Sequence, residues 1–197
     1  MNATTKKQVV VIAGPSGGGK NTIIKELIRR FPRCTRLVTA TTRAPRQGER
    51  DGEDYYFLSE ETFMRALETG DILEHRFAAG LGTHYGAYRP DLEKRIAAGM
   101  IVLAHLDIIG ARYLKQHYNA TTIFIMPDSI ESLEHRVRVR NPDMSENEVI
   151  ERMKVAREEL KTHAPEYDYQ VRNADGKLDA AVENVVAILQ KEGYTLE

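Results

Sequence analysis

A glycine-rich segment near the start of the chain has the residue types and the spacing that bind phosphate groups. An apolar run over residues 9–13 precedes it, and a segment with the apolar spacing of a helix follows it. Glycines leave successive backbone N–H groups free to surround phosphate oxygens, and the N-terminus of a following helix adds its positive dipole. We therefore expect a nucleotide-binding P-loop formed by Gly14, Pro15, Ser16, Gly17, Gly18, Gly19, Lys20, Asn21 and Thr22.

The last positions of this loop point to the chemistry. Lys20 would reach the outer phosphates of the nucleotide, and the residue after it is normally Ser or Thr, whose hydroxyl binds Mg²⁺. This chain has Asn21 there. Asn21 is therefore the candidate protein ligand for a metal that nucleotide phosphates and water would otherwise hold. A plain tight turn is the alternative, but the Gly14–Lys20 spacing between a strand and a helix favours phosphate binding.

A second group of residues could bind another phosphate. Arg43 and Arg46 lie three positions apart, with Pro45 restricting the backbone between them. Guanidinium groups hold phosphate through two parallel hydrogen bonds and stay charged. The hydroxyls of Tyr55 and Tyr85 could donate to the same phosphate. Taken alone, two arginines in a polar loop more commonly form a solvated basic surface.

The elements that must position these groups follow from the apolar periodicity. The pattern predicts strands over residues 8–13, 37–40, 55–58, 72–78, 100–104, 121–126 and 169–171. It predicts helices over residues 19–31, 60–69, 90–99, 107–117, 129–139, 145–163 and 177–192, with Ser59, Ser129 and Ser145 as N-caps. This alternation indicates an α/β fold with a parallel sheet flanked by helices. The short strands and turns over 40–96 interrupt it and indicate an insertion.

Size and composition narrow the function further. The 197 residues suit one domain, with 42% hydrophobic and 29% charged residues. A net charge of −1 argues against a general nucleic-acid or membrane-surface binder. The single cysteine, Cys34, excludes an intrachain disulfide and a cysteine-rich zinc site. Without an apolar run long enough for a membrane span or signal peptide, the cytoplasm is the expected compartment.

The segment from Thr41 to Phe57 resembles the signature of the guanylate kinase family. The family pattern is T-T-R-x-P-R-x-G-E-x-x-G-x-D-Y-x-F, and the residues here are TTRAPRQGERDGEDYYF. The loop Gly14–Gly17 also has the family form. The resemblance implies a P-loop NTPase-type core over about 6–39, 97–133 and 164–197. It also implies a GMP-binding insertion over about 40–96 and a helical lid over about 134–163.

The resemblance also implies roles for individual residues. The P-loop would bind ATP with Mg²⁺, and GMP would be bound by Thr39, Arg43, Arg46, Tyr55, Glu74, Tyr85 and Asp107. Within this set, the carboxylates of Glu74 and Asp107 would accept hydrogen bonds from the guanine N–H groups. Phosphoryl transfer would be catalysed by Lys20, Arg136, Arg140 and Arg152. Simpler structural roles are also open: Asp107 could cap a helix, and Arg136 and Arg140 could form a solvated face.

Several positions depart from the family pattern. Asn21 replaces the Ser or Thr metal ligand, and His105 stands where the family has an Asp on the metal side. Ile109 stands where Gln is usual, and Ala87 replaces a Ser or Thr that helps to read guanine. The segment from 74 to 85 is about two residues longer than usual.

These observations leave three functions open. The first is a guanylate kinase that converts ATP and GMP (or dGMP) to ADP and GDP with Mg²⁺, as a monomer or homodimer. Asn21 and His105 motivate a second, a catalytically weakened nucleotide- or protein-binding module. Ala87 and the longer segment motivate a third, a P-loop kinase for another phosphorylated acceptor such as a ribose phosphate. Lys20 and the complete arginine–tyrosine signature favour the first.

Overall fold

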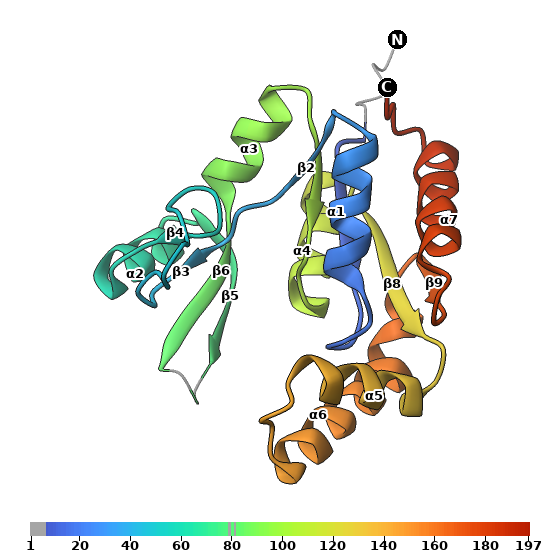
Figure 1. Cartoon of the computed structure of the whole chain (residues 1–197). Coiled ribbons are helices and arrows are strands. Elements are labelled where there is room, and N and C mark those ends of the chain that lie inside the picture. The colour runs from blue at the N-terminus through green and yellow to red at the C-terminus, as the bar shows by residue number, and fades with distance from the viewer. Residues whose placement is uncertain (1–6, 79, 81) are drawn as a thin grey trace.

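The computed structural model describes residues 7–78, 80 and 82–197, and it is built around a parallel sheet of five strands (Figure 1). The strand order is β2-β7-β1-β8-β9, and every neighbouring pair is parallel. The strands are β1 (Val9–Ala13), β2 (Cys34–Arg36), β7 (Ile101–Ala104), β8 (Thr121–Pro127) and β9 (Tyr169–Asn173). The predicted α/β class with a parallel central sheet is confirmed.

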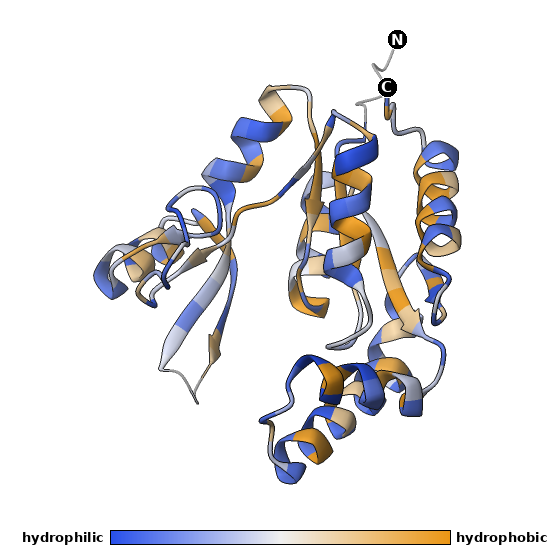
Figure 2. Cartoon of the chain, viewed as in Figure 1, coloured by the Kyte–Doolittle hydropathy of each residue, from blue (hydrophilic) through white to orange (hydrophobic). Residues whose placement is uncertain are grey.

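Helices cover both faces of this sheet, because alternate residues of β1 point to opposite sides. On one side, Val10 and Ile12 pack with α1 (Lys20–Arg30) and α7 (Leu178–Lys191). On the other, Val9 and Val11 pack with α3 (Arg89–Ala97) and α4 (Ile108–Tyr118). In Figure 2 much of β8 is apolar, as expected for a strand that is buried on both faces.

A second sheet lies beside the first, within the segment predicted as an insertion (Figure 1). Its strands, in the order β4-β3-β6-β5, are β3 (Ala40–Thr41), β4 (Tyr56–Phe57), β5 (Ile72–Ala78) and β6 (Thr83–Tyr88). Helix α2 (Glu60–Glu68) covers one face, where Phe63 packs with Ala40 and Ile72. The N-cap predicted at Ser59 is confirmed, since its hydroxyl accepts from the Thr62 N–H at 3.1 Å.

Two further helices form a separate hairpin, which lies below the core in Figure 1. Helices α5 (Ile130–Arg140) and α6 (Glu146–Glu158) pack through Leu133, Val137, Val149, Met153 and Ala156. Ser129 and Ser145 cap them as predicted, and Ser145 forms a capping box with Glu148. The predicted single helix over 145–163 is wrong at its end, because Glu159–His163 forms a π-helical turn and Ala164–Glu166 a 3-10 turn.

The strand predicted over residues 37–40 is also wrong. The chain is a strand at 34–36, leaves the central sheet, and becomes a strand of the second sheet only at Ala40. Leu37 and Val38 are buried in this crossing, where the Val38 N–H donates to the buried Asp91 carboxylate at 2.9 Å. The Leu37 N–H still donates to the Leu103 carbonyl of β7 at 3.0 Å, so backbone pairing ends at Leu37 and the side chain of Asp91 takes its place at Val38.

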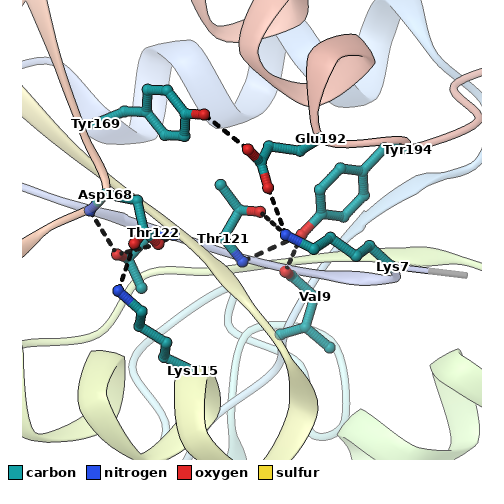
Figure 3. Close-up of polar contacts among 9 residues, drawn as sticks. All are labelled: Lys7, Val9, Lys115, Thr121, Thr122, Asp168, Tyr169, Glu192 and Tyr194. Atoms are coloured by element: carbon teal, nitrogen blue, oxygen red, sulfur yellow. Dashed lines mark hydrogen bonds and ion pairs between the residues drawn. The ribbon is translucent and has the colours of Figure 1, made fainter. Parts of the chain in front are cut away.

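Residues near the end of the chain form hydrogen bonds with the amino ends of central strands (Figure 3). The Tyr194 hydroxyl donates to the Val9 carbonyl at 2.6 Å and accepts from the Thr121 N–H at 3.2 Å. Beside it, Glu192 accepts from the Tyr169 hydroxyl at 2.7 Å and pairs with Lys7. This network lies at the edge of the sheet opposite to the P-loop. No helix in the described part of the chain is long and apolar enough to span a membrane.

Candidate active site

A cleft of about 1190 Å³ joins most of the residues singled out from the sequence. It opens at the carboxyl ends of the parallel strands, where ligands bind in sheets of this kind. The central sheet, the second sheet and the α5–α6 hairpin all contribute to its lining. The cleft therefore brings the predicted nucleotide loop and the predicted acceptor pocket to one place.

The P-loop has a backbone that only glycine fits. Gly14 has φ +138°, and a Cβ there would lie 2.5 Å from the Ile125 carbonyl oxygen. Gly19 has φ +92°, and a Cβ there would lie 2.2 Å from the side-chain amide nitrogen of Asn173. That amide donates to the Gly18 carbonyl at 2.9 Å. The positive φ values of its glycines thus set the shape of the loop, and the hydrogen bond from Asn173 of β9 holds it in place.

Lys20 begins α1 and lies under the loop, only 8% exposed. Its Nζ donates to the carbonyls of Gly14 at 2.6 Å and Pro15 at 2.8 Å. Burial lowers the pKa of Lys20 to about 8, with Glu159 opposing this shift and Arg140 adding to it. A phosphate group would favour the charged form, because it offers the ammonium group an anionic partner.

The next residue, Asn21, is exposed and lines the same cleft. Within residues 7–78, 80 and 82–197, no group of three or more His, Cys, Asp or Glu side chains could hold a metal ion. Asn21 offers one hard amide oxygen at the start of α1. The donor set therefore fits a Mg²⁺ ion carried by nucleotide phosphates and water, and not an ion held by protein ligands alone.

His105 follows β7, the neighbour of β1, and is partly buried at the lining of the cleft. Burial and the positive charges of Lys20, Arg36 and Arg76 lower the pKa of His105 to about 3. The imidazole is therefore neutral at physiological pH. It therefore adds no charge to the cleft.

The predicted phosphate-binding residues of the insertion lie close together. Arg43 donates to both oxygens of Glu49 at 2.6 Å, and its Cζ lies 5.0 Å from the centre of the Tyr55 ring. The rings of Tyr55 and Tyr85 are 6.0 Å apart, and both line the cleft. Neither Arg43 nor Arg46 is part of the lining. The Arg43–Glu49 pair raises the pKa of Arg43 and lowers that of Glu49 to about 2.

The two predicted guanine-reading carboxylates also line the cleft. Glu74 comes from β5, and burial together with the charge of Asp107 raises the pKa of Glu74 to about 7. Asp107 caps α4, since its Oδ1 accepts from the N–H groups of Ile109 at 3.0 Å and Gly110 at 3.2 Å. Thr39 lines the cleft between the two sheets.

The three predicted catalytic arginines of the hairpin are placed differently. Arg136 donates to Asp175 Oδ1 at 2.7 Å and to the Asn173 carbonyl at 2.9 Å. Arg140 lines the cleft and adds positive charge near Lys20. Arg152 lies outside the lining, and its closest polar contact is with the Ser16 hydroxyl at 3.4 Å.

Comparison with known proteins decides the family, since the guanylate kinase family model matches residues 6–192. The chain belongs to the guanylate kinase family. It is 42% identical to the guanylate kinase of Synechocystis sp. over 190 residues, 96% of each chain. It is 39% identical to that of Trichormus variabilis over 193 residues, 95% of this chain and 94% of the relative.

A solved structure gives the same family. The guanylate kinase from Anaplasma phagocytophilum superposes with a TM-score of 0.70 at 28% identity. The match covers 98% of this chain and 89% of that one. The guanylate kinase resemblance stated from the sequence is therefore confirmed, and the fold is that of the P-loop kinases of this family.

Two departures from the guanylate kinase pattern replace polar residues with apolar ones, one at the lining of the cleft and one in the core. Ala87 is fully buried and packs in the core cluster that contains Leu92, so it offers no hydroxyl. Ile109 is 59% exposed beside Asp107, at the lining of the cleft. Relative to the family pattern, an apolar side chain therefore replaces a polar one at Ile109 in the lining of the cleft and at Ala87 in the core.

Several cleft residues were missed from the sequence. Asn173 ends β9 and Asp175 follows it, and their position at the end of a parallel strand was the available signal. Glu159 lies on the π-helical turn, which local periodicity does not announce. Arg36 and Arg76 lie far apart in the sequence, and only the sheet arrangement places both of them at one cleft.

Proposed function

We propose that this guanylate kinase family member transfers the γ-phosphoryl group of ATP to GMP or dGMP. The observation that carries the proposal is the single cleft that contains both Lys20 and the carboxylates of Glu74 and Asp107. A phosphate-binding loop and a purine-reading pocket in one cavity suit a reaction between two nucleotides. The two curated relatives described above, both guanylate kinases, support the same reaction.

The P-loop holds the donor in this proposal. Its backbone N–H groups, the N-terminus of α1 and Lys20 surround the outer phosphates. Asn21, with phosphates and water, holds Mg²⁺, which neutralises phosphate charge when it is bound. Phosphoryl transfer depends on positioning and charge stabilisation, and the acceptor phosphate is already ionised. No side chain therefore needs to act as a strong base.

The arginines of the hairpin stabilise the transferring phosphoryl group. Arg140 already lies in the cleft near Lys20, and Arg136 is held at its edge by Asp175. Arg152 contacts the P-loop through Ser16. Guanidinium groups suit this role because they remain charged and bind several oxygens at once.

The insertion binds the acceptor. Glu74 and Asp107 accept from guanine N1–H and the 2-amino group, which adenine does not present in that arrangement. The Thr39 hydroxyl bonds the base oxygen. Arg43, Arg46, Tyr55 and Tyr85 hold the phosphate, so Arg43 shares its guanidinium between Glu49 and this phosphate. The protein acts in the cytoplasm as a monomer or homodimer, without nucleic-acid or membrane partners.

A coupled assay of ADP release tests the proposal with GMP, dGMP, AMP, UMP and ribose 5-phosphate as acceptors. We expect turnover with GMP and dGMP, and loss of turnover in Lys20→Ala. Lys25→Ala is the matched control, because this exposed lysine lies on the same helix. Preference for a non-guanine acceptor would overturn the proposal, and GMP binding without turnover would indicate a binding module.

A further inference from the structure

Two arginines in the cleft have no role in the family signature. Arg36 ends β2 and Arg76 lies in β5, and both side chains are exposed into the cleft. Among the residues that the structure describes, neither guanidinium has a hydrogen bond or ion pair. By contrast, Arg43, Arg95 and Arg136 are all paired with carboxylates. Arg36 and Arg76 therefore keep all their donors for a ligand.

The sheet order places Arg36 on the path from the P-loop to the insertion. β2 lies next to β7, and β7 lies next to β1, from which the P-loop emerges. Arg36 is opposite Leu103, and His105 follows two residues later on the same side of the sheet. Along the carboxyl edge, the P-loop, His105 and Arg36 thus follow one another.

Arg76 approaches from the second sheet. It lies directly opposite Tyr85 in the antiparallel β5–β6 pair, and opposite residues project from the same face. Glu74, Arg76 and Tyr85 line the cleft, whereas His75 and Phe77 make ring contacts with Phe63 and His84 on the other face. Arg76 therefore lies beside a predicted phosphate ligand and two residues from a predicted base reader.

Three positive charges of the cleft act on the same residue, His105. Lys20, Arg36 and Arg76 all lower the pKa of His105, which leaves three cations around a neutral imidazole. The acidic groups that share the cleft with them are Glu74, Asp107 and Glu159, and Arg76 acts on Glu74 and Glu159. In the part of the chain that the structure describes, none of these carboxylates forms an ion pair with Arg36 or Arg76. The region accordingly suits a ligand that carries more than one negative charge.

We propose that Arg36 and Arg76 bind the phosphate of the acceptor nucleotide from opposite sides of the cleft. Arg36 contacts it from the central sheet and Arg76 from the insertion, in addition to Arg43, Tyr55 and Tyr85. The identity of the acceptor as GMP rests on the proposed function. The two arginines therefore add to the affinity for the acceptor through its phosphate and not through its base.

Calorimetric titration with GMP and with guanosine tests this. In Arg36→Gln and in Arg76→Gln we expect the Kd for GMP to rise by about tenfold, the cost of one charge-assisted hydrogen bond. The Kd for guanosine should not change, since it has no phosphate. Arg65→Gln is the matched control, because Arg65 lies on α2 outside the cleft. An unchanged Kd for ATP shows that each variant is folded.

Three results would overturn the proposal. These are an unchanged affinity for GMP, a parallel loss of affinity for GMP and guanosine, and a selective loss for ATP. The proposed function fails in a different way, when the wild-type protein prefers another acceptor of the panel. The same titration then uses that acceptor and its dephosphorylated form, so the arginines are tested independently of the base.

Discussion

Glu74 and Asp107 bring two carboxyl groups into one cleft, one from a strand of the second sheet and one from the N-cap of α4. Burial and the neighbouring charge of Asp107 raise the pKa of Glu74 to about 7. The folded protein therefore binds a proton at Glu74 that the unfolded chain loses near pH 4.5. The free energy of unfolding should fall as the pH rises from about 4.5 to about 7.

Replacing Glu74 by Gln should remove this pH dependence. At pH 8 we expect Glu74→Gln to raise the free energy of unfolding by on the order of 2 kcal/mol, with little change at pH 4. The preference for GMP over AMP should fall, because a guanine N–H loses its carboxylate acceptor. Urea unfolding at both pH values and the acceptor panel measure these effects. Glu61→Gln is the control, because Glu61 is an exposed residue of α2. Equal stabilisation of Glu74→Gln at both pH values would contradict the account.

The positions that depart from the family on the metal side give a second prediction. Asn21→Ser restores a hydroxyl next to Lys20, and His105→Asp adds a negative charge among Lys20, Arg36 and Arg76. Both changes favour a bound dication, so the double variant should raise kcat or reach half-maximal rate at several-fold lower Mg²⁺. A Mg²⁺ titration of the rate measures this, with Mn²⁺ run in parallel. If neither quantity changes, these two positions do not limit metal use.

The contact between Arg136 and Asp175 gives a third prediction. Asp175 holds Arg136 through Nε at 2.7 Å and also accepts from the Ser132 hydroxyl at 2.6 Å. Asp175→Ala should lower kcat about tenfold by loosening Arg136, with the KM for GMP unchanged. Arg136→Ala should lower kcat further, and the double variant should match it, because Asp175 acts through Arg136. Asp179→Ala, an exposed partner of Arg30, is the control, and additive losses would contradict the account.

Local sequence patterns were sufficient for the donor side of the cleft. Strand, glycine loop and helix are contiguous in the chain, and Gly14 and Gly19 have the positive φ values that make glycine necessary. The caps at Ser129 and Ser145 are equally local, because each involves a side chain and a backbone N–H three residues later. Such features can be predicted, since all of their partners lie within one short segment.

Other features depend on partners that are distant in the sequence. Leu37 and Val38 have the composition of a strand, but Asp91 and the crossing between sheets determine their conformation. Likewise, Arg36 and Arg76 line one cleft only through the order of the strands and the pairing of β5 with β6. No periodicity in one segment contains that information.

The Tyr194–Val9 hydrogen bond bears on how the molecule is made. It joins residues 185 positions apart, and β1 lies between strands that begin at residues 101 and 121. During synthesis, the apolar first strand must therefore remain without its neighbours until most of the chain has left the ribosome. The amino edge of the sheet is closed only after Tyr194 has emerged. Nascent chains of this protein thus expose an apolar strand for much of translation, when contacts with chaperones can prevent aggregation.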